Sequence, residues 1–99
     1  MLKVQNMRSN SSGREVANQF VITDTGRIVF QSYSSTIAEI NYNTGTILIY
    51  PAYNYSKTTG KYRNQFFEQE GFSALANLKS LDSAISEGKF GEWKIQKVS

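Results

Sequence analysis

Apolar and polar residues alternate along the first half of the chain in short runs that turn residues separate. The first break is Asp24-Thr25-Gly26 and the second is Asn43-Thr44-Gly45, and each is flanked by branched and aromatic residues. Period-two runs joined through Gly-containing turns are typical of β-hairpins. The pattern therefore predicts two hairpins between residues 16 and 50. Pro51 should end the last strand, because proline cannot donate to a sheet.

A helical period replaces this alternation in the second half. Tyr62, Phe66 and Phe67 fall on one face and predict a helix that Thr58 or Thr59 caps and Gly71 stops. A second helix is predicted from Ser73 to Gly88, because an apolar stripe recurs at helical spacing. The stripe consists of Ala74, Leu78, Leu81 and Ile85. A terminal strand that contains Phe90, Trp93, Ile95 and Val98 is predicted to return to the sheet.

Residues 1–14 are polar and carry three basic side chains without an acid. This composition predicts a flexible basic arm, in which only Leu2 to Val4 could form a short edge strand. Residues 15–99 are then a single α+β domain. The predicted fold is an antiparallel sheet of four to five strands with two helices packed on one face.

Composition narrows the chemistry. The chain has no cysteine and no histidine, so disulfides, thiolate nucleophiles and imidazole chemistry are excluded. Its eight carboxylates are scattered, and we expect no enzyme activity, no cofactor and no metal site. No apolar run approaches a membrane span, which predicts a cytoplasmic protein. The net charge of +3 is polarised, since bases dominate residues 1–63 and acids dominate residues 64–88.

The stretch from Tyr55 to Phe67 concentrates basic and aromatic residues and is the candidate binding site. It resembles a phosphate-binding loop only superficially, because tyrosines stand where that motif requires glycine and a hydroxyl residue. A simpler anion or partner site beside a helix N-terminus remains. Its expected residues are Tyr55, Lys57, Thr58, Lys61, Tyr62 and Arg63.

The alternative for this stretch is structural, with a threonine that caps the helix, solvated lysines and tyrosines that fill the core. Under either interpretation we expect Phe66 and Phe67 to face inward, and Lys57, Lys61 and Arg63 to remain in water. Tyrosines interleaved with bases suit single-stranded nucleic acid, because bases stack on rings while cations follow the backbone. They suit protein interfaces equally well.

Three segments carry a family resemblance: NQF (18–20), FQSYSSTIAEI (30–40) and YSKTTGKYRNQF (55–66). They resemble a group of small uncharacterised proteins of phages and mobile elements of Gram-positive bacteria, over about residues 16–72. The resemblance implies a role in the host bacterial cell, where such accessory proteins often block defence systems. The expected function is inhibition of a host defence nuclease or its ribonucleoprotein, with an anti-CRISPR inhibitor of Cas9 as the leading case.

Three alternatives remain open: an accessory or regulatory protein that binds nucleic acid, a structural role in a virion, and a homodimer that covers the open sheet face. Many anti-CRISPR proteins that imitate DNA are strongly acidic, whereas this chain is basic. Mimicry of DNA by the whole surface is therefore disfavoured. Contact through the acidic helical side, or competition at an RNA-binding step, is the expected mode of inhibition.

Overall fold

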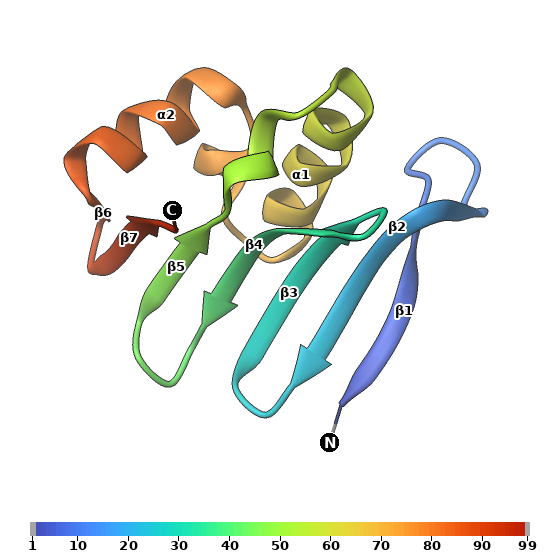
Figure 1. Ribbon diagram of the computed structural model, residues 1–99, viewed down its shortest axis with the longest axis horizontal. Coiled ribbons are helices and arrows are strands. Elements are labelled where there is room, and N and C mark those ends of the chain that lie inside the picture. The colour runs from blue at the N-terminus through green and yellow to red at the C-terminus, as the bar shows by residue number, and fades with distance from the viewer. Residues whose placement is uncertain (1, 99) are drawn as a thin grey trace.

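The computed structural model describes residues 2–98, which form one seven-stranded sheet, two α-helices and two short 3₁₀ helices (Figure 1). The strands are β1 (Lys3–Arg8), β2 (Glu15–Asp24), β3 (Arg27–Ser32), β4 (Ser35–Asn41), β5 (Thr46–Ile49), β6 (Lys89–Phe90) and β7 (Trp93–Lys97). The helices are η1 (Pro51–Asn54), α1 (Lys57–Gln69), η2 (Ser73–Leu75) and α2 (Leu78–Glu87). The predicted α+β class is confirmed, and both predicted hairpins form.

The strands follow the order β1-β2-β3-β4-β5-β7-β6 across the sheet. Neighbours are antiparallel except β5 and β7, which pair in parallel with Ile47 beside Ile95. The chain leaves the sheet after β5, passes through η1, α1 and α2, and returns beside β5. The prediction of four to five strands was therefore too low. The N-terminal strand and the short β6 account for the difference.

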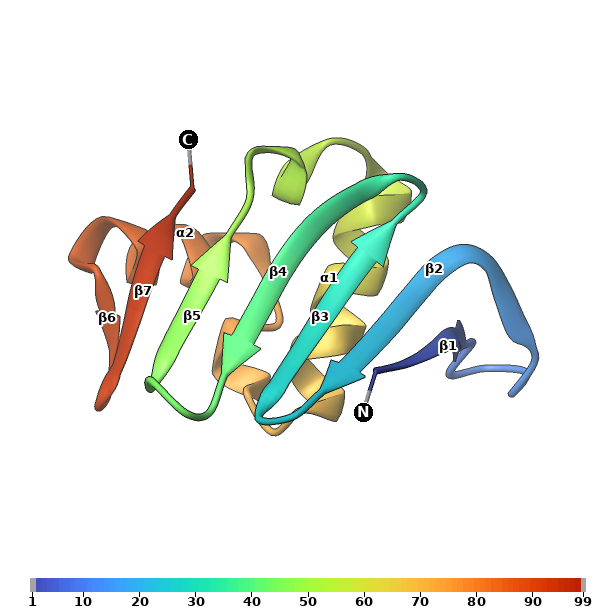
Figure 2. The same cartoon turned by 60° about the horizontal axis from the view of Figure 1, so that its bottom comes forward.

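Both α-helices cover the same face of the sheet, as predicted (Figure 2). The buried side chains of the core lie between the helices and the strands. Phe66 and Phe67 of α1 are fully buried there, as the helical period predicts, and the Phe66 ring stacks on Phe30 of β3 with centroids 5.7 Å apart. Ile40, Ile47 and Ile95 extend this layer along neighbouring strands. Burial of these side chains supplies the main driving force for the fold.

Side-chain caps set the beginnings of the two helices. Ser56 accepts a hydrogen bond from the Thr59 amide at 3.1 Å, and Asn77 accepts one from the Ser80 amide at 2.8 Å. The expectation that Thr58 or Thr59 caps α1 was therefore wrong, because Ser56 has the extended backbone that a cap requires. The second helix begins at Leu78 and not at Ser73, because Asn77 has the extended backbone of a cap and its side chain accepts the hydrogen bond from the Ser80 amide.

The N-terminal segment differs from the predicted arm. Residues 3–8 form β1, which pairs antiparallel with β2 from Lys3 opposite Thr23 to Arg8 opposite Glu15. Met7 reaches the core, and the Gln65 side chain of α1 donates a hydrogen bond to the Arg8 carbonyl at 2.5 Å. Only residues 9–14 form a loop, so most of this basic segment is fixed to the sheet.

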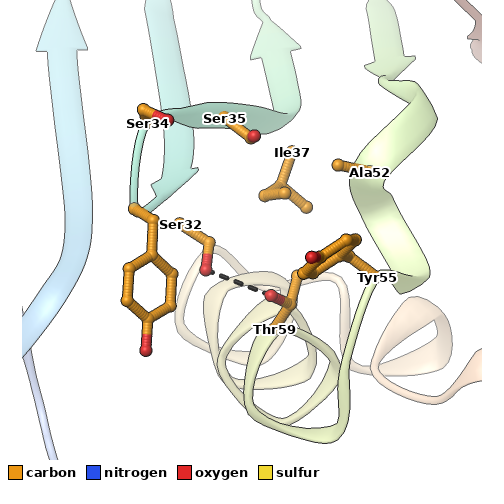
Figure 3. Close-up of a pocket in the computed structure, with 8 residues that line it drawn as sticks. Ser32, Ser34, Ser35, Ile37, Ala52, Tyr55 and Thr59 are labelled. Carbon is orange, nitrogen blue, oxygen red and sulfur yellow. Dashed lines mark hydrogen bonds between the residues drawn. The ribbon is translucent and has the colours of Figure 1, made fainter.

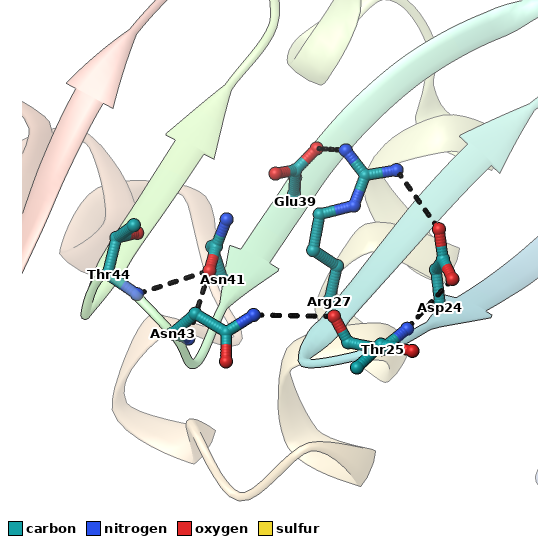
Figure 4. A network of polar contacts seen from close by, with 7 residues as sticks. All are labelled: Asp24, Thr25, Arg27, Glu39, Asn41, Asn43 and Thr44. Atoms are coloured by element: carbon teal, nitrogen blue, oxygen red, sulfur yellow. Dashed lines mark hydrogen bonds and ion pairs between the residues drawn. The ribbon is translucent and has the colours of Figure 1, made fainter. Parts of the chain in front are cut away.

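The other face of the sheet is not covered by a helix and carries a polar network (Figure 4). Arg27 lies between Glu39 at 3.5 Å and Asp24 at 4.0 Å. At the nearby turns, the Asn43 side chain donates to the Thr25 carbonyl, and a Cβ atom at Gly26 would collide with that Asn43 amide. Glycine is therefore required at this turn on steric grounds as well as by its positive φ of 71°.

Candidate functional site

A cleft of about 440 Å³ opens where the β3–β4 turn meets η1 and the beginning of α1 (Figure 3). Its wall is formed by four hydroxyl residues, two tyrosines and two apolar side chains. These are Ser32, Ser34, Ser35 and Thr59, then Tyr33 and Tyr55, then Ile37 and Ala52. Two separate segments of the chain, residues 32–37 and residues 52–59, therefore build one concave surface.

A chain of hydroxyl groups forms the floor of the cleft. The Ser32 and Thr59 hydroxyls lie 3.1 Å apart, and the Ser56 hydroxyl donates to Thr59 Oγ1 at 3.2 Å. Ser32 belongs to β3, whereas Ser56 and Thr59 belong to the first turn of α1 and its cap. The helix that carries one side of the cleft is thus bonded directly to the strand that carries the other. This arrangement holds the two sides at a fixed separation.

Two strongly exposed tyrosines flank the opening: Tyr33 is 56% exposed and Tyr55 is 83% exposed. Tyr33 has a positive φ of 56° in a two-residue turn, because Ser32 pairs with Ser35. Glycine is the usual residue at such a position, since a side chain costs about 1–2 kcal/mol in the left-handed region. A 2.6 Å hydrogen bond from the Tyr33 amide to the Asn18 carbonyl fixes this conformation.

The electrostatics of the cleft combine an uncharged wall with a positive rim. No Lys, Arg, Asp or Glu lines the wall. Lys57 begins α1, whose first turn has no acid and whose N-terminal amides carry partial positive charge. Glu68 lies in the last turn of the same helix, which has no base. The charges of α1 are thus opposite to those that its dipole favours, and they concentrate positive potential beside the cleft.

The structure separates the six predicted site residues into two groups. Tyr55 is exposed immediately after η1 and lines the cleft. Lys57, Thr58 and Lys61 are exposed on α1 and do not line it, and Lys61 lines a separate depression. Tyr62 and Arg63 are buried, with 8% and 2% of their surfaces exposed. The expectation that Arg63 stays in water was therefore wrong, and Tyr62 belongs to the core.

Arg63 is a structural anchor beneath η1. Its Nη1 donates to the Tyr53 carbonyl at 2.8 Å, and its Nε and Nη2 donate to Asn64 Oδ1. Burial lowers the pKa of Arg63. The Tyr53 hydroxyl in turn donates to Asp82 of α2 at 2.7 Å, and this hydrogen bond raises the pKa of Tyr53. The segment that carries the Ala52 wall of the cleft is thus held to both helices.

Sequence reasoning missed the β3–β4 half of the cleft. Ser32, Ser34 and Ser35 occur in the sequence analysis only within the family pattern, and Tyr33, one of the interleaved tyrosines, is not among the expected site residues. Their signal was a solvent-exposed aromatic at a turn position that normally requires glycine. The sequence alone does not place Tyr33 in this turn, because the turn is defined by the pairing of Ser32 with Ser35.

Residues 2–98 contain neither a group of metal ligands nor a membrane-spanning helix. In that range no three metal-ligating side chains are grouped so that they could hold a metal ion. The same residues form no helix that is long and apolar enough to span a membrane. Among the buried side-chain polar atoms of the described residues, the two amide atoms of the fully buried Gln19 on β2 are those without a hydrogen bond.

Comparison with known proteins identifies a family without assigning an activity. A model described as a family of unknown function, DUF8033, matches residues 2–83, a stretch that runs from β1 into α2 and includes the whole cleft. Neither a curated protein nor a solved structure matches the chain. Because the match extends over most of the sequence, the protein belongs to the DUF8033 family.

Proposed function

We propose that this protein is a non-enzymatic inhibitor that binds a host defence nuclease through the cleft beside α1. The contact surface in this proposal is the β3–β4 turn, η1 and the first turn of α1. Inhibition would follow from occupation of a surface that the nuclease needs for its substrate or for a conformational step. The proposal places its action in the cytoplasm of the host bacterial cell.

The observation that carries the proposal is the pair of exposed tyrosines at a serine-rich opening. Tyrosine and serine on loops are characteristic of protein-binding surfaces, because rigid rings supply contact area and hydroxyls adapt their hydrogen bonds. Tyr33 is held outward by a backbone conformation that costs free energy. Retention of a large ring at such a position is understandable if the ring contacts a partner.

The choice of a nuclease as partner comes from the resemblance of the chain to small proteins of phages and mobile elements. In that setting an anti-CRISPR inhibitor of a Cas9 ribonucleoprotein is the leading case. The exposed Lys57 at the beginning of α1, next to the cleft in sequence, favours contact with an acidic patch of the protein partner. This differs from our expectation of contact through the acidic helical side, because the cleft lies at the basic end of α1.

The test is cleavage of a DNA duplex by a purified Cas9–guide RNA complex from a Gram-positive host, with increasing amounts of the protein. We expect inhibition that saturates near one equivalent per complex. The double substitution Tyr33→Ala/Tyr55→Ala should weaken inhibition by about tenfold or more, since interface tyrosines are frequent hot spots. Tyr42→Ala is the matched control, because Tyr42 is exposed at the β4–β5 turn and outside the cleft. Full cleavage in the presence of excess folded protein would contradict the proposal.

A second candidate function is binding of single-stranded nucleic acid by Tyr55, Lys57 and Lys61. The observation that favours it is an exposed aromatic ring, Tyr55, just before α1, followed by the exposed cations Lys57 and Lys61 one helical turn apart on α1. Fluorescence anisotropy with labelled oligothymidylate tests it, and affinity should fall steeply with salt. Undetectable binding at low salt would exclude this function and leave the protein partner.

A further inference from the structure

We infer that the cleft accepts one neutral aromatic side chain, presented by an acidic segment of a protein partner. This inference rests on the proposed function and specifies what its binding surface recognises. The β3–β4 turn, η1 and the first turn of α1 form the two sides of the pocket, and the partner supplies the ring that enters it.

The size and wall of the cleft suit a single ring. About 440 Å³ lies at the lower end of the range for ligand pockets. Ile37, Ala52 and the ring of Tyr55 supply apolar surface around the opening (Figure 3). A charged group that entered would lose water without gaining an ion-pair partner, because the wall carries no charged side chain. A neutral ring would bury apolar area without this penalty.

Unused hydroxyls add a polar requirement. The Ser32 and Thr59 hydroxyls bond to each other. By contrast, the hydroxyls of Ser34 and Ser35 make no hydrogen bond with another described residue. A tyrosine hydroxyl or a tryptophan N–H could bond to them, and phenylalanine could not. Tyrosine or tryptophan is therefore the preferred ring.

The charge around the cleft indicates which residues of the partner should flank the inserted ring. Between residues 32 and 63 the only acid is Glu39, which pairs with Arg27 on the opposite face of the sheet. The first turn of α1, which begins at Lys57, contains no acid, and no carboxylate lines the cleft. Asp82, the acid that reaches η1, accepts a hydrogen bond from the Tyr53 hydroxyl. Glutamate or aspartate residues that flank the ring would complement this potential, and the attraction would weaken with salt.

A nucleobase is also a neutral ring, but the observations favour a protein segment. Phosphates accompany every base, and only Lys57 adjoins the cleft closely in sequence. Lys61 lines a different depression beside α1, and its Nζ lies 5.2 Å from the centre of the Tyr62 ring. A backbone with one charge per nucleotide would meet too few cations here.

The direct test is a titration followed by ¹H–¹⁵N NMR with the peptide Glu-Glu-Trp-Glu-Glu, acetylated and amidated. We expect binding at about millimolar concentration, with shifts of the Ser34, Ser35 and Ala52 amides that diminish in high salt. The peptides Glu-Glu-Ala-Glu-Glu and Lys-Lys-Trp-Lys-Lys should each bind at least about tenfold more weakly. Equal binding of the alanine peptide, or no shift with the tryptophan peptide, overturns the inference. Tighter binding of pentathymidylate at the same amides overturns it in favour of a nucleobase.

Substitutions that fill the cleft provide the second test. Ser35→Leu places an apolar side chain in the opening and should abolish peptide binding, and Ala52→Leu repeats the test from the other side. Ser86→Leu is the matched control, since Ser86 is exposed on α2 and outside the cleft. Melting temperatures identify any variant that fails to fold.

The same variants separate this inference from the proposed function. In one outcome, Ser35→Leu inhibits the nuclease as well as the wild-type protein does, while Tyr33→Ala/Tyr55→Ala does not. That result would show that the nuclease contacts the tyrosines at the rim and that no ring of the partner enters the cleft. If the tryptophan peptide binds the cleft but the protein inhibits no nuclease, the ring specificity holds and the proposed function fails.

Discussion

At the scale of single residues, Tyr33 places an exposed ring at the edge of the cleft at the expense of stability. Its ring is exposed and its backbone lies in the left-handed region, so neither burial nor conformational preference favours tyrosine there. Asn18 is the other non-glycine residue with positive φ in residues 2–98, and its carbonyl accepts the hydrogen bond from the Tyr33 amide. The two unusual conformations therefore support each other at the edge of the cleft.

Tyr33→Gly should raise the free energy of unfolding by about 0.5–1 kcal/mol, because the strain that is relieved exceeds the added entropy of the unfolded glycine. The same substitution should weaken binding of the partner, since the ring is lost. Urea denaturation and the nuclease assay measure the two effects. A loss of stability would show that the ring contributes to packing, contrary to its exposure.

The burial of Arg63 could not be predicted from the sequence around it. A basic residue beside two lysines reads as part of a charged surface, because arginine is rarely fully buried. Its burial depends on Tyr53, ten residues earlier, whose carbonyl accepts its hydrogen bond. Helical phase correctly predicted that Phe66 and Phe67 face inward. The phase could not reveal that η1 covers the adjacent side of α1.

At the scale of elements, α1 is the helix whose charges run against its dipole. Lys57 stands in the first turn and Glu68 in the last, and each lies near partial charges of its own sign. The arrangement costs stability, yet it keeps the rim of the cleft positive. As at Tyr33, a feature of the cleft is present here although it lowers the stability of the fold.

Lys57→Glu should therefore stabilise the protein by about 0.5–1 kcal/mol and should abolish binding of an acidic partner. Glu68→Lys is the matched control, because it corrects the charge at the other end of α1. It should stabilise by a similar amount and leave binding unchanged. Thermal denaturation at low salt measures the first effect, and peptide titration measures the second. Unimpaired binding by Lys57→Glu would remove the electrostatic part of the inference.

The elements that sequence predicted best are those with local causes. Asp24-Thr25-Gly26 and Asn43-Thr44-Gly45 were sufficient to locate two turns, and Gly88 ends α2 as its position predicts. The pairing of β5 with β7 joins segments that nothing local connects. The cleft likewise depends on a turn that meets a helix cap only after the sheet has formed, so half of it could not be predicted.

At the scale of the whole molecule, the ionisation of Glu70 opposes folding. It caps the carboxyl end of α1 and lines a groove against β1 and β2, where burial raises its pKa above the ordinary value. Partial burial of the Tyr42 hydroxyl raises the pKa of that half-exposed side chain, and the charge of Glu70 raises it further. The folded state therefore holds the Glu70 proton more tightly than the unfolded state does.

The sign of the pH dependence follows from this difference. The penalty is present in full at neutral pH and disappears as pH falls below the ordinary glutamate pKa of about 4.3. Glu70→Gln should consequently be more stable than the wild-type protein at pH 7 and equally stable below pH of about 4. Glu92→Gln, which removes an exposed carboxylate at the β6–β7 turn, should show little difference at either pH. Denaturant midpoints across this range decide the matter.

The parallel pair of β5 and β7 has a consequence for the order in which the molecule assembles. Strands β1 to β5 meet through short connections, whereas β7 reaches β5 only after two helices have been laid across the sheet. Closing so long a loop is slow, because its entropy is lost before any contact forms. The β6–β7 hairpin should therefore join the sheet last. Until it does, the flank of β5 stays exposed to strands of neighbouring chains at high expression.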